Sequence, residues 1–272
     1  MVLFLRVVLA ALALSAAADE AGRLEVALRD GGDLAPFLVG KAAGWVDSIV
    51  IGSQDLSPLM FAAKYGAARA TLKVLMAAGA DVTLAQATTA TTPLMFAARE
   101  GHADALRFLL KFDQNVDAGD EHGATALALA ALECRADIAR ALIDYDADPY
   151  HADGAGNTVF HVGAFYCSEE MRAGPQAGAG ADGRGRAFAL ALLDAKVRGG
   201  LDSLSQTGRA PLHLAAKANA KSYAHALRAA GADARLPSPA DGATPAALAR
   251  AGGFQSLADE LVAPPRADDE EL

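Results

Sequence analysis

The feature that most constrains the fold is a short phrase, of the form Thr-Pro-Leu-x-x-Ala-Ala, that recurs along the chain. Copies begin at Ser57, Thr92, Thr125 and Ala210, and weaker copies begin at Thr158 and Thr244. In chain order, the intervals between successive starts are 35, 33, 33, 52 and 34 residues. A period of about 33 residues is typical of a solenoid, in which no unit buries its apolar face alone and stacked units share one continuous core.

Each phrase contains the residues that begin an α-helix. In the second copy Thr92 is placed to cap the helix, and Pro93 occupies the first turn, where a missing N–H costs nothing. Leu94, Ala97 and Ala98 fall on one helix face, and the small alanines let the next helix approach closely. Nine residues after each start stands a residue where the first helix must turn: Gly66, Gly101, Cys134, Cys167, Asn219 and Gly253.

A second amphipathic helix is predicted in each unit, as Leu106, Leu109 and Leu110 illustrate. The residues expected to end these helices in a left-handed conformation are Gly79, Asp113, Asp146 and Gly231. Thin stacked units need few large side chains. This agrees with a chain that is 53% hydrophobic but only 6% aromatic.

The phrase and its period resemble the ankyrin-repeat family, whose own phrase is Thr-Pro-Leu-His-x-Ala. The resemblance covers residues 53–262, which is 210 of the 272 residues. It implies an all-α solenoid of about six helix-turn-helix units with short β-hairpin loops. Residues 19–52 are then an N-terminal cap or a degenerate first repeat, because residues 23–34 look like a second helix with its Gly-x-Asp cap.

The interval of 52 residues contains an insertion at about residues 168–186, which is rich in glycine. We expect a mobile loop between the two helices of that repeat, with the second helix starting near Arg186. Residues 178–183 also satisfy the Gly-x-Gly-x-x-Gly spelling of a dinucleotide site. No strand precedes them, since residues 168–172 are charged, so a loop is favoured over a phosphate site.

The two ends of the chain lie outside the repeats. Residues 1–18 resemble a secretory signal peptide, with a 12-residue uncharged run and small residues Ala16 and Ala18 before a cleavage point at Asp19. The chain would then be in the secretory pathway or secreted. Residues 11–19 also resemble the repeat helix of residues 126–134, and on that alternative the chain is cytoplasmic. Residues 263–272 form an acidic tail expected to be disordered.

The polar side chains do not form a pattern typical of catalysis. None of the six histidines pairs at the spacing of a helix-borne metal site, and no nucleophile has an activating base nearby in sequence. We therefore expect no catalytic residue, cofactor or metal. Since histidines of the ankyrin phrase bridge neighbouring repeats, the resemblance implies a structural role for His161 and His213.

The two cysteines, Cys134 and Cys167, occupy the same place in adjacent repeats. Stacked helices place equivalent atoms about 10 Å apart, beyond the limit of about 7 Å between the Cα atoms of a disulfide. The sequence therefore predicts two free, packed thiols.

The net charge limits the class of partner. The chain has 24 Lys and Arg against 33 Asp and Glu, a formal charge of -9. A nucleic-acid-binding surface needs clustered cations to replace the counterions of the phosphates, so nucleic acid is not expected. A partner with some basic character is favoured.

The resemblance also implies where a partner protein would bind. Ankyrin repeats usually bind on the concave side, through the hairpin tips and the exposed end of each first helix. The matching residues here are Lys64, Tyr65, Arg99, Glu100, Leu132, Glu133, Phe165, Tyr166 and Lys217, with His122 and Arg209 from the hairpins. Alternatively, Phe165 and Tyr166 pack under the insertion and are not available to a partner.

Together these features predict a monomeric, non-catalytic scaffold that binds another protein and has no membrane span. Two alternatives remain. One is a regulatory or ligand-binding protein that uses the glycine-rich insertion, and the other is a structural spacer in the lumen of the secretory pathway.

Overall fold

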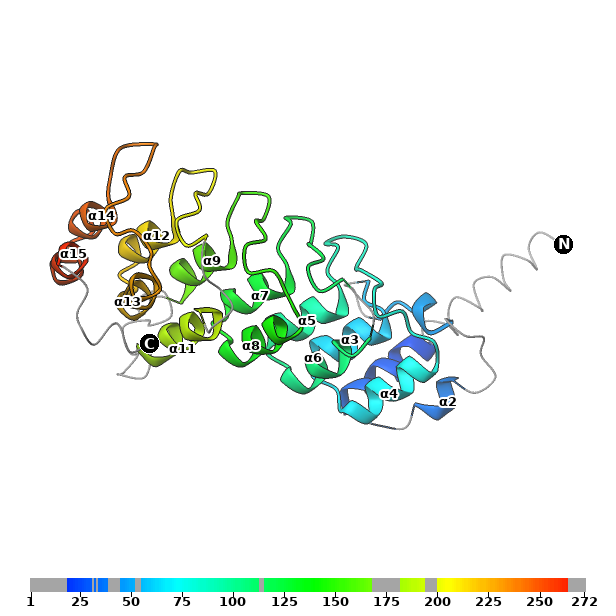
Figure 1. Ribbon diagram of the computed structural model, residues 1–272. Coiled ribbons are helices and arrows are strands. Elements are labelled where there is room, and N and C mark those ends of the chain that lie inside the picture. The colour runs from blue at the N-terminus through cyan, green and yellow to red at the C-terminus, as the bar shows by residue number, and fades with distance from the viewer. Residues whose placement is uncertain are drawn as a thin grey trace, which may run out of the picture. The chain divides into compact units, whose positions relative to one another are not determined.

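The structure is a computed structural model (Figure 1) that describes residues 19–30, 32, 34–38, 45–51, 55–112, 115–167, 182–193 and 200–263. The chain forms two compact parts, an N-terminal part (Met1–Asn115) and a C-terminal part (Val116–Leu272). The predictions made for residues 1–18, Asp113, residues 168–181 and residues 264–272 lie outside the described residues.

The N-terminal part contains two helix pairs preceded by other helical segments. Residues 19–30 are helical, with Leu24 and Leu28 buried, and are followed by α2 (Ala35–Leu38) and the 3-10 helix η1 (Trp45–Ser48). The pairs are α3 (Pro58–Lys64) with α4 (Arg69–Ala77), and α5 (Pro93–Glu100) with α6 (Ala103–Leu109). Since α3 packs on α5 and α4 on α6, the first and second helices form two rows.

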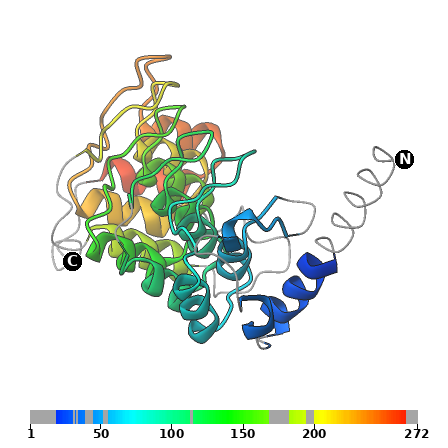
Figure 2. The ribbon, with the colours of Figure 1, turned by 90° about the vertical axis from the view of Figure 1, so that its right-hand side faces the viewer.

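The C-terminal part contains four helix pairs in the same arrangement. They are α7 (Ala126–Leu132) with α8 (Ala136–Asp144), α9 (Val159–Tyr166) with α11 (Asp182–Leu193), α12 (Pro211–Lys217) with α13 (Lys221–Ala229), and α14 (Pro245–Ala251) with α15 (Gln255–Val262). The first helices α7, α9, α12 and α14 pack in one row, and α8, α11 and α13 pack in the other. The loops before successive first helices project on the same side of both rows (Figures 1 and 2).

The hydroxyl caps predicted from the phrase are confirmed at four of its six copies, whereas the Thr158 hydroxyl accepts no amide of α9. The Thr92 hydroxyl accepts from the Met95 amide and the Thr125 hydroxyl from the Ala128 amide, both at 3.3 Å. Ser57 and Thr244 cap α3 and α14 in the same way. At Ala210 no hydroxyl is present, and the ring of His213 accepts from the Ala210 amide instead. Each first helix therefore begins where its sequence predicts.

The left-handed conformation predicted for the second-helix ends is confirmed at the described residues, and every first-helix turn but one also adopts it. At the first-helix turns φ is positive at Gly66, Gly101, Cys134, Asn219 and Gly253, and at the second-helix ends it is positive at Gly79, Asp146 and Gly231. The exception is Cys167, the C-cap of α9, where φ is -89°.

The loops of the C-terminal part are hairpin-shaped and linked to one another by backbone hydrogen bonds. Within one loop the Asp120 amide donates to the Ala124 carbonyl at 3.0 Å. Between loops the Gly154 amide donates to the His122 carbonyl at 2.7 Å, and the Gln206 amide donates to the Ala155 carbonyl at 3.0 Å. None of the described segments is a β-strand; Ile51 and Leu56 form an isolated antiparallel bridge.

Helix α11 begins at Asp182, four residues before the predicted start at Arg186. Its first residues include two glycines, which disfavour a helix locally. Packing explains one of them, because a Cβ at Gly185 would lie only 2.6 Å from the Cys167 carbonyl oxygen. The end of α9 and the start of α11 thus approach too closely for any side chain.

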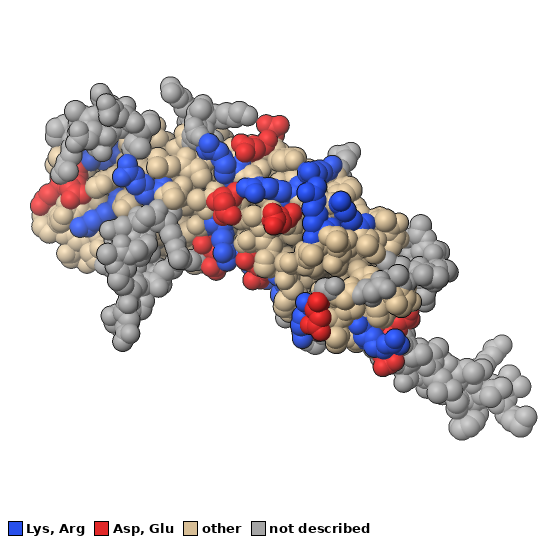
Figure 3. All heavy atoms as spheres, turned by 90° about the horizontal axis from the view of Figure 1, so that it is seen from below, with Lys and Arg blue, Asp and Glu red and all other residues tan. Residues whose placement is uncertain are grey.

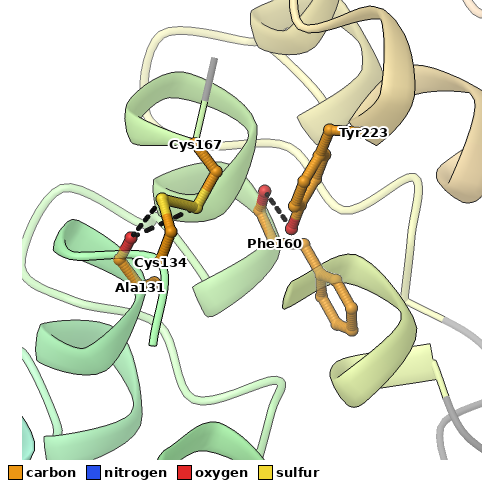
Figure 4. Close-up of a disulfide and its surroundings, with 5 residues drawn as sticks. All are labelled: Ala131, Cys134, Phe160, Cys167 and Tyr223. Carbon is orange, nitrogen blue, oxygen red and sulfur yellow. Dashed lines mark hydrogen bonds between the residues drawn. A yellow bond between two sulfur atoms is a disulfide. The ribbon is translucent and has the colours of Figure 1, made fainter. Parts of the chain in front are cut away.

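Cys134 and Cys167 form a disulfide (Figure 4), so the prediction of two free thiols is wrong. Their Cα atoms are 5.5 Å apart, within the range that a disulfide needs. The spacing of about 10 Å applies to helix bodies, whereas both cysteines follow the helix ends. There Cys134 is left-handed and Cys167 is not, so the chain leaves the two helices differently and the cysteines meet.

Gly163 marks a second close approach in the C-terminal part. The corresponding residue of every other phrase is alanine: Ala62, Ala97, Ala130, Ala215 and Ala249. A Cβ at Gly163 would lie 2.5 Å from the hydroxyl oxygen of Tyr223 and 3.0 Å from the ring of Phe188. Tyr223 is buried, and its hydroxyl donates to the Phe160 carbonyl at 3.3 Å (Figure 4). The missing methyl at Gly163 therefore makes room for an aromatic side chain from α13.

Candidate protein-binding surface

In the N-terminal part, four predicted site residues lie at the ends of α3 and α5. Tyr65 is 48% exposed and rests on Phe61, with ring centroids 4.4 Å apart. The Arg29 and Lys64 cations lie 5.8 Å and 5.5 Å from the Tyr65 ring centroid. Arg99 and Glu100 form an ion pair at 3.3 Å on the neighbouring helix. This surface therefore offers an aromatic ring among cations, a combination that suits mixed polar and apolar contacts.

In the C-terminal part, five predicted residues lie at the ends of α7, α9 and α12. Tyr166 is 43% exposed and packs edge-on against half-buried Phe165, with ring centroids 5.1 Å apart. Leu132 and Glu133 are half-buried at the end of α7, and Lys217 is exposed at the end of α12.

Three of these residues line a cavity of about 290 Å³, which we call the α7–α9 pocket. Its walls come from α7, α9, α12 and the hairpins that precede α7 and α9. The lining residues are Ala124, Ala128, Leu132, Asp153, Asn157, His161, Val162, Phe165, Tyr166 and Leu214. The alternative that Phe165 and Tyr166 pack under the insertion concerns residues 168–181, which lie outside the described residues.

Two buried histidines donate hydrogen bonds as neutral rings, and one of them, His161, lines the α7–α9 pocket. Burial is the main reason that the pKa values of His161 and His213 are lowered. His161 Nδ1 accepts from the Thr158 amide, which leaves the proton on Nε2 to donate to the Arg209 carbonyl at 3.0 Å. His213 bonds the Ala243 carbonyl in the same way at 3.1 Å. The predicted bridging of neighbouring repeats is confirmed.

The two hairpin residues predicted to contact a partner differ in availability. The His122 side chain is 81% exposed, with Nε2 3.8 Å from the Glu121 carboxylate. The Arg209 side chain is only 19% exposed, and its guanidinium donates to Asp241 at 2.6 Å. Arg209 thus joins two hairpins within the protein, whereas His122 points to solvent.

The charge is distributed unequally between the two parts. Residues 116–272 have 22 Asp and Glu against 14 Lys and Arg, a formal charge of -8, whereas residues 1–115 have 11 against 10. On the side away from the hairpin loops, basic and acidic side chains are interspersed (Figure 3). The acidic excess of the chain therefore belongs almost entirely to the part that contains the α7–α9 pocket.

Sequence reasoning missed several residues of the pocket. Ala128, Val162 and Leu214 lie in the middle of the phrase, one turn before the exposed positions that the resemblance indicates. Val162 and Leu214 remain partly exposed, although the pattern places them in a buried helix. Asp153 looks like an ordinary turn aspartate. An apolar residue on the polar side of a short helix is the signal that could have identified them.

A family model described as ankyrin repeats, in three copies, matches residues 59–153. The chain contains ankyrin repeats. Ankyrin repeats are generally protein–protein interaction modules and are typically non-catalytic. No curated protein matches the chain.

Two further observations concern only the described residues of this chain. Among them, no group of three or more His, Cys, Asp and Glu side chains could hold a metal ion. No helix in the described ranges is both long enough and apolar enough to span a membrane.

Proposed function

We propose that this protein binds a partner protein through the concave face of its repeats, using the first-helix ends and hairpin loops. The observation that carries the proposal is the exposure of large side chains at these ends. Tyr65 and Tyr166 are each more than 40% exposed, and Tyr166 borders the α7–α9 pocket. Aromatic anchors beside a cavity, with polar residues around them, are the usual source of binding energy in protein interfaces.

A scaffold without catalysis agrees best with the chemistry of this surface. The two buried histidines are fully used in hydrogen bonds between repeats, so neither is free to act as a base. The Glu100 carboxylate at the end of α5 is paired with Arg99. The surface therefore supports recognition, and the partner is held by packing and hydrogen bonds.

Site-specific photocrosslinking tests the proposed face. A benzoylphenylalanine at position 65 or 166 should crosslink a protein from the native cell, and mass spectrometry would then identify it. The matched control is position 145, since Tyr145 is 42% exposed but follows α8 in the other row of helices. Crosslinking at position 145 but at neither of the other two positions would contradict the proposal.

Affinity measurements with the identified partner give a second test. Alanine substitutions of Tyr65, Arg99, Phe165 and Tyr166 should each be measured against it, and a true anchor costs about 2 kcal/mol or more, a loss of roughly 30-fold. Unchanged affinity across all four variants would refute binding by this face.

We also propose that the protein acts in an oxidising compartment, reached by cleavage after Ala18. The Cys134–Cys167 disulfide supports this proposal, because disulfides persist in secretory and extracellular environments and are rare in the cytosol. Maleimide labelling of protein taken directly from cells should modify neither cysteine until a reductant is added. N-terminal sequencing should begin at Asp19. Free thiols together with a retained Met1 would overturn the assignment.

A further inference from the structure

The α7–α9 pocket combines an apolar floor with one charged wall. Val162, Phe165 and Leu214 contribute apolar surface, whereas Asp153 and Asn157 line the side formed by the hairpin. Pockets that hold whole small molecules usually measure about 300–1,000 Å³. At about 290 Å³, this pocket is at the lower end of that range and has room for a single large side chain presented by another protein.

Asp153 accepts several hydrogen bonds but forms no ion pair within the part of the chain that the structure describes. Its Oδ1 accepts from the amides of Ala155 and Asn157 at 2.9 Å and 2.8 Å. Its Oδ2 accepts one longer bond, of 3.3 Å, from the Asn157 side chain. Among the described residues no Lys or Arg forms an ion pair with it. A half-buried carboxylate of this kind is stabilised by a cation that pairs with it, because the pair is partly shielded from water.

The same protein shows how another hairpin aspartate obtains its cation. Arg209 directly precedes the phrase that starts at Ala210, and it donates to Asp241 of the next hairpin at 2.6 Å. In the pocket the residue that directly precedes the phrase is Ala124, which lines the cavity and carries no charge. Arg209 therefore supplies a cation to Asp241. Ala124 supplies none to Asp153, and the two residues line the same cavity.

The surroundings of the pocket are also acidic. Asp120 and Glu121 lie on the neighbouring hairpin, which is joined to the Asp153 hairpin by the hydrogen bond between the Gly154 amide and the His122 carbonyl. Without the acidic tail, residues 116–263 have 18 Asp and Glu against 13 Lys and Arg, a formal charge of -5. Such a field attracts basic segments and repels acidic ones.

We propose that the α7–α9 pocket binds an extended segment of a partner protein, in which an apolar side chain enters the cavity and a nearby Lys or Arg pairs with Asp153. The inference rests on the proposed function and adds the chemistry of the partner. The cation lies one to three residues from the apolar side chain, because each residue of an extended chain spans about 3.3 Å.

A peptide selection on the full, oxidised protein provides the test. The probe is a random 12-residue library displayed on phage, and the enriched peptides are synthesised with fluorescein for anisotropy titrations. We expect enrichment of Leu, Phe, Met or Trp within three residues of Lys or Arg. Asp153→Asn keeps the acceptor for both amides but removes the charge, and it should weaken binding about tenfold or more.

Matched variants distinguish binding in the pocket from attraction by the overall negative charge of the C-terminal part. Asp120→Asn makes the same change on the neighbouring hairpin, outside the pocket lining, and should weaken binding less than threefold. Val162→Trp fills the cavity, and Ala124→Arg supplies an internal cation to Asp153; both should abolish binding. Thermal unfolding followed by circular dichroism verifies that each variant folds.

Three results would overturn the inference. They are enriched peptides without a basic residue, equal losses for Asp153→Asn and Asp120→Asn, and unchanged binding to folded Val162→Trp. All three leave the proposed function intact, because that function is judged by crosslinking and affinity of the native partner at Tyr65 and Tyr166. Conversely, a native partner that crosslinks only at position 145 refutes the proposed function whatever the peptides do.

Discussion

The two parts of the protein are built from the same repeat but present different chemistry. The N-terminal part surrounds Tyr65 with the cations of Arg29 and Lys64, and its formal charge is close to zero. The C-terminal part places Phe165 and Tyr166 beside a cavity whose charged wall is Asp153. Since the first helices of both parts begin at the same phrase and pack in rows, this difference in surface chemistry lies in a few exposed positions. The repeat therefore fixes the scaffold, whereas these positions give each part its own surface chemistry.

The two parts also differ in how their cores are held. The C-terminal part has a disulfide, two bridging histidines and a glycine that admits Tyr223. At the fourth place of the phrase, where His161 and His213 stand, the N-terminal part has Met60 and Met95. Its 115 residues include no cysteine. Stability in a repeat protein is a sum over neighbouring units. Changes to these features should therefore affect one part and leave the other.

Loss of the disulfide should have the largest effect. Cys134→Ala with Cys167→Ala opens a cross-link between residues 33 apart in sequence, and the loop-entropy relation gives a loss of roughly 3–4 kcal/mol in unfolding free energy. Hydrogen exchange followed by mass spectrometry should show faster exchange in α7 to α9 and unchanged exchange in α3 to α5. Equal acceleration in both parts would contradict separate stabilisation.

Gly163→Ala should destabilise the C-terminal part by about 2–3 kcal/mol, because overfilling a packed core has this cost. The change would normally strengthen a helix by about 1 kcal/mol, so the sign itself is the test. Its cause is the 2.5 Å approach of the new methyl to the Tyr223 hydroxyl. Urea titrations should therefore show a smaller loss in the Tyr223→Phe background. Stabilisation by Gly163→Ala alone would disprove the close packing.

Acid should weaken the C-terminal part selectively. Burial lowers the pKa values of His161 and His213 below 6.5, although Asp153 and Asp241 oppose this shift. The folded state therefore binds fewer protons than the unfolded state. The contribution of the two neutral histidines to the unfolding free energy is complete above pH 6.5 and is lost as the pH falls. Each histidine removes at most about 1.4 kcal/mol per pH unit.

Urea midpoints at pH 7.5 and 5.5 measure this loss. The control variant His161→Met with His213→Met copies the N-terminal part, where Met95 sulfur lies 3.4 Å from the Thr92 amide. It should flatten the pH dependence even if it lowers stability at pH 7.5. A wild-type midpoint that stays constant between these pH values would argue against buried neutral histidines.

The features that could be predicted from sequence depend on residues close together in the chain. The Thr92 and Thr125 hydroxyls cap their helices by accepting from the amide three residues later in the chain. Gly79 ends a helix because its own backbone adopts the left-handed conformation. The histidine bridges were predictable because the family resemblance supplies the neighbouring repeat. Local chemistry and a known period were therefore sufficient for the fold.

The features that could not be predicted depend on how distant residues meet. The disulfide needs the different backbone conformations of Cys134 and Cys167. The start of α11 needs Gly185 against the Cys167 carbonyl, which overrides the low helix propensity of glycine. The pocket needs Asp153 from a hairpin beside three helices. None of these contacts has a period or a motif of its own.

The smallest expected effect tests whether the scaffold is common to both parts. Thr92→Ala in the N-terminal part and Thr125→Ala in the C-terminal part remove the same cap, with the same 3.3 Å hydrogen bond. Each should cost about 1 kcal/mol, because one amide of the first turn loses its acceptor. Hydrogen exchange should place the loss in α5 for the first variant and in α7 for the second. Thr→Ser at either position keeps the hydroxyl and should restore most of the stability. Losses that differ by more than twofold would mean that the cap depends on its part, and the contrast between the two parts would then extend from the exposed positions into the scaffold.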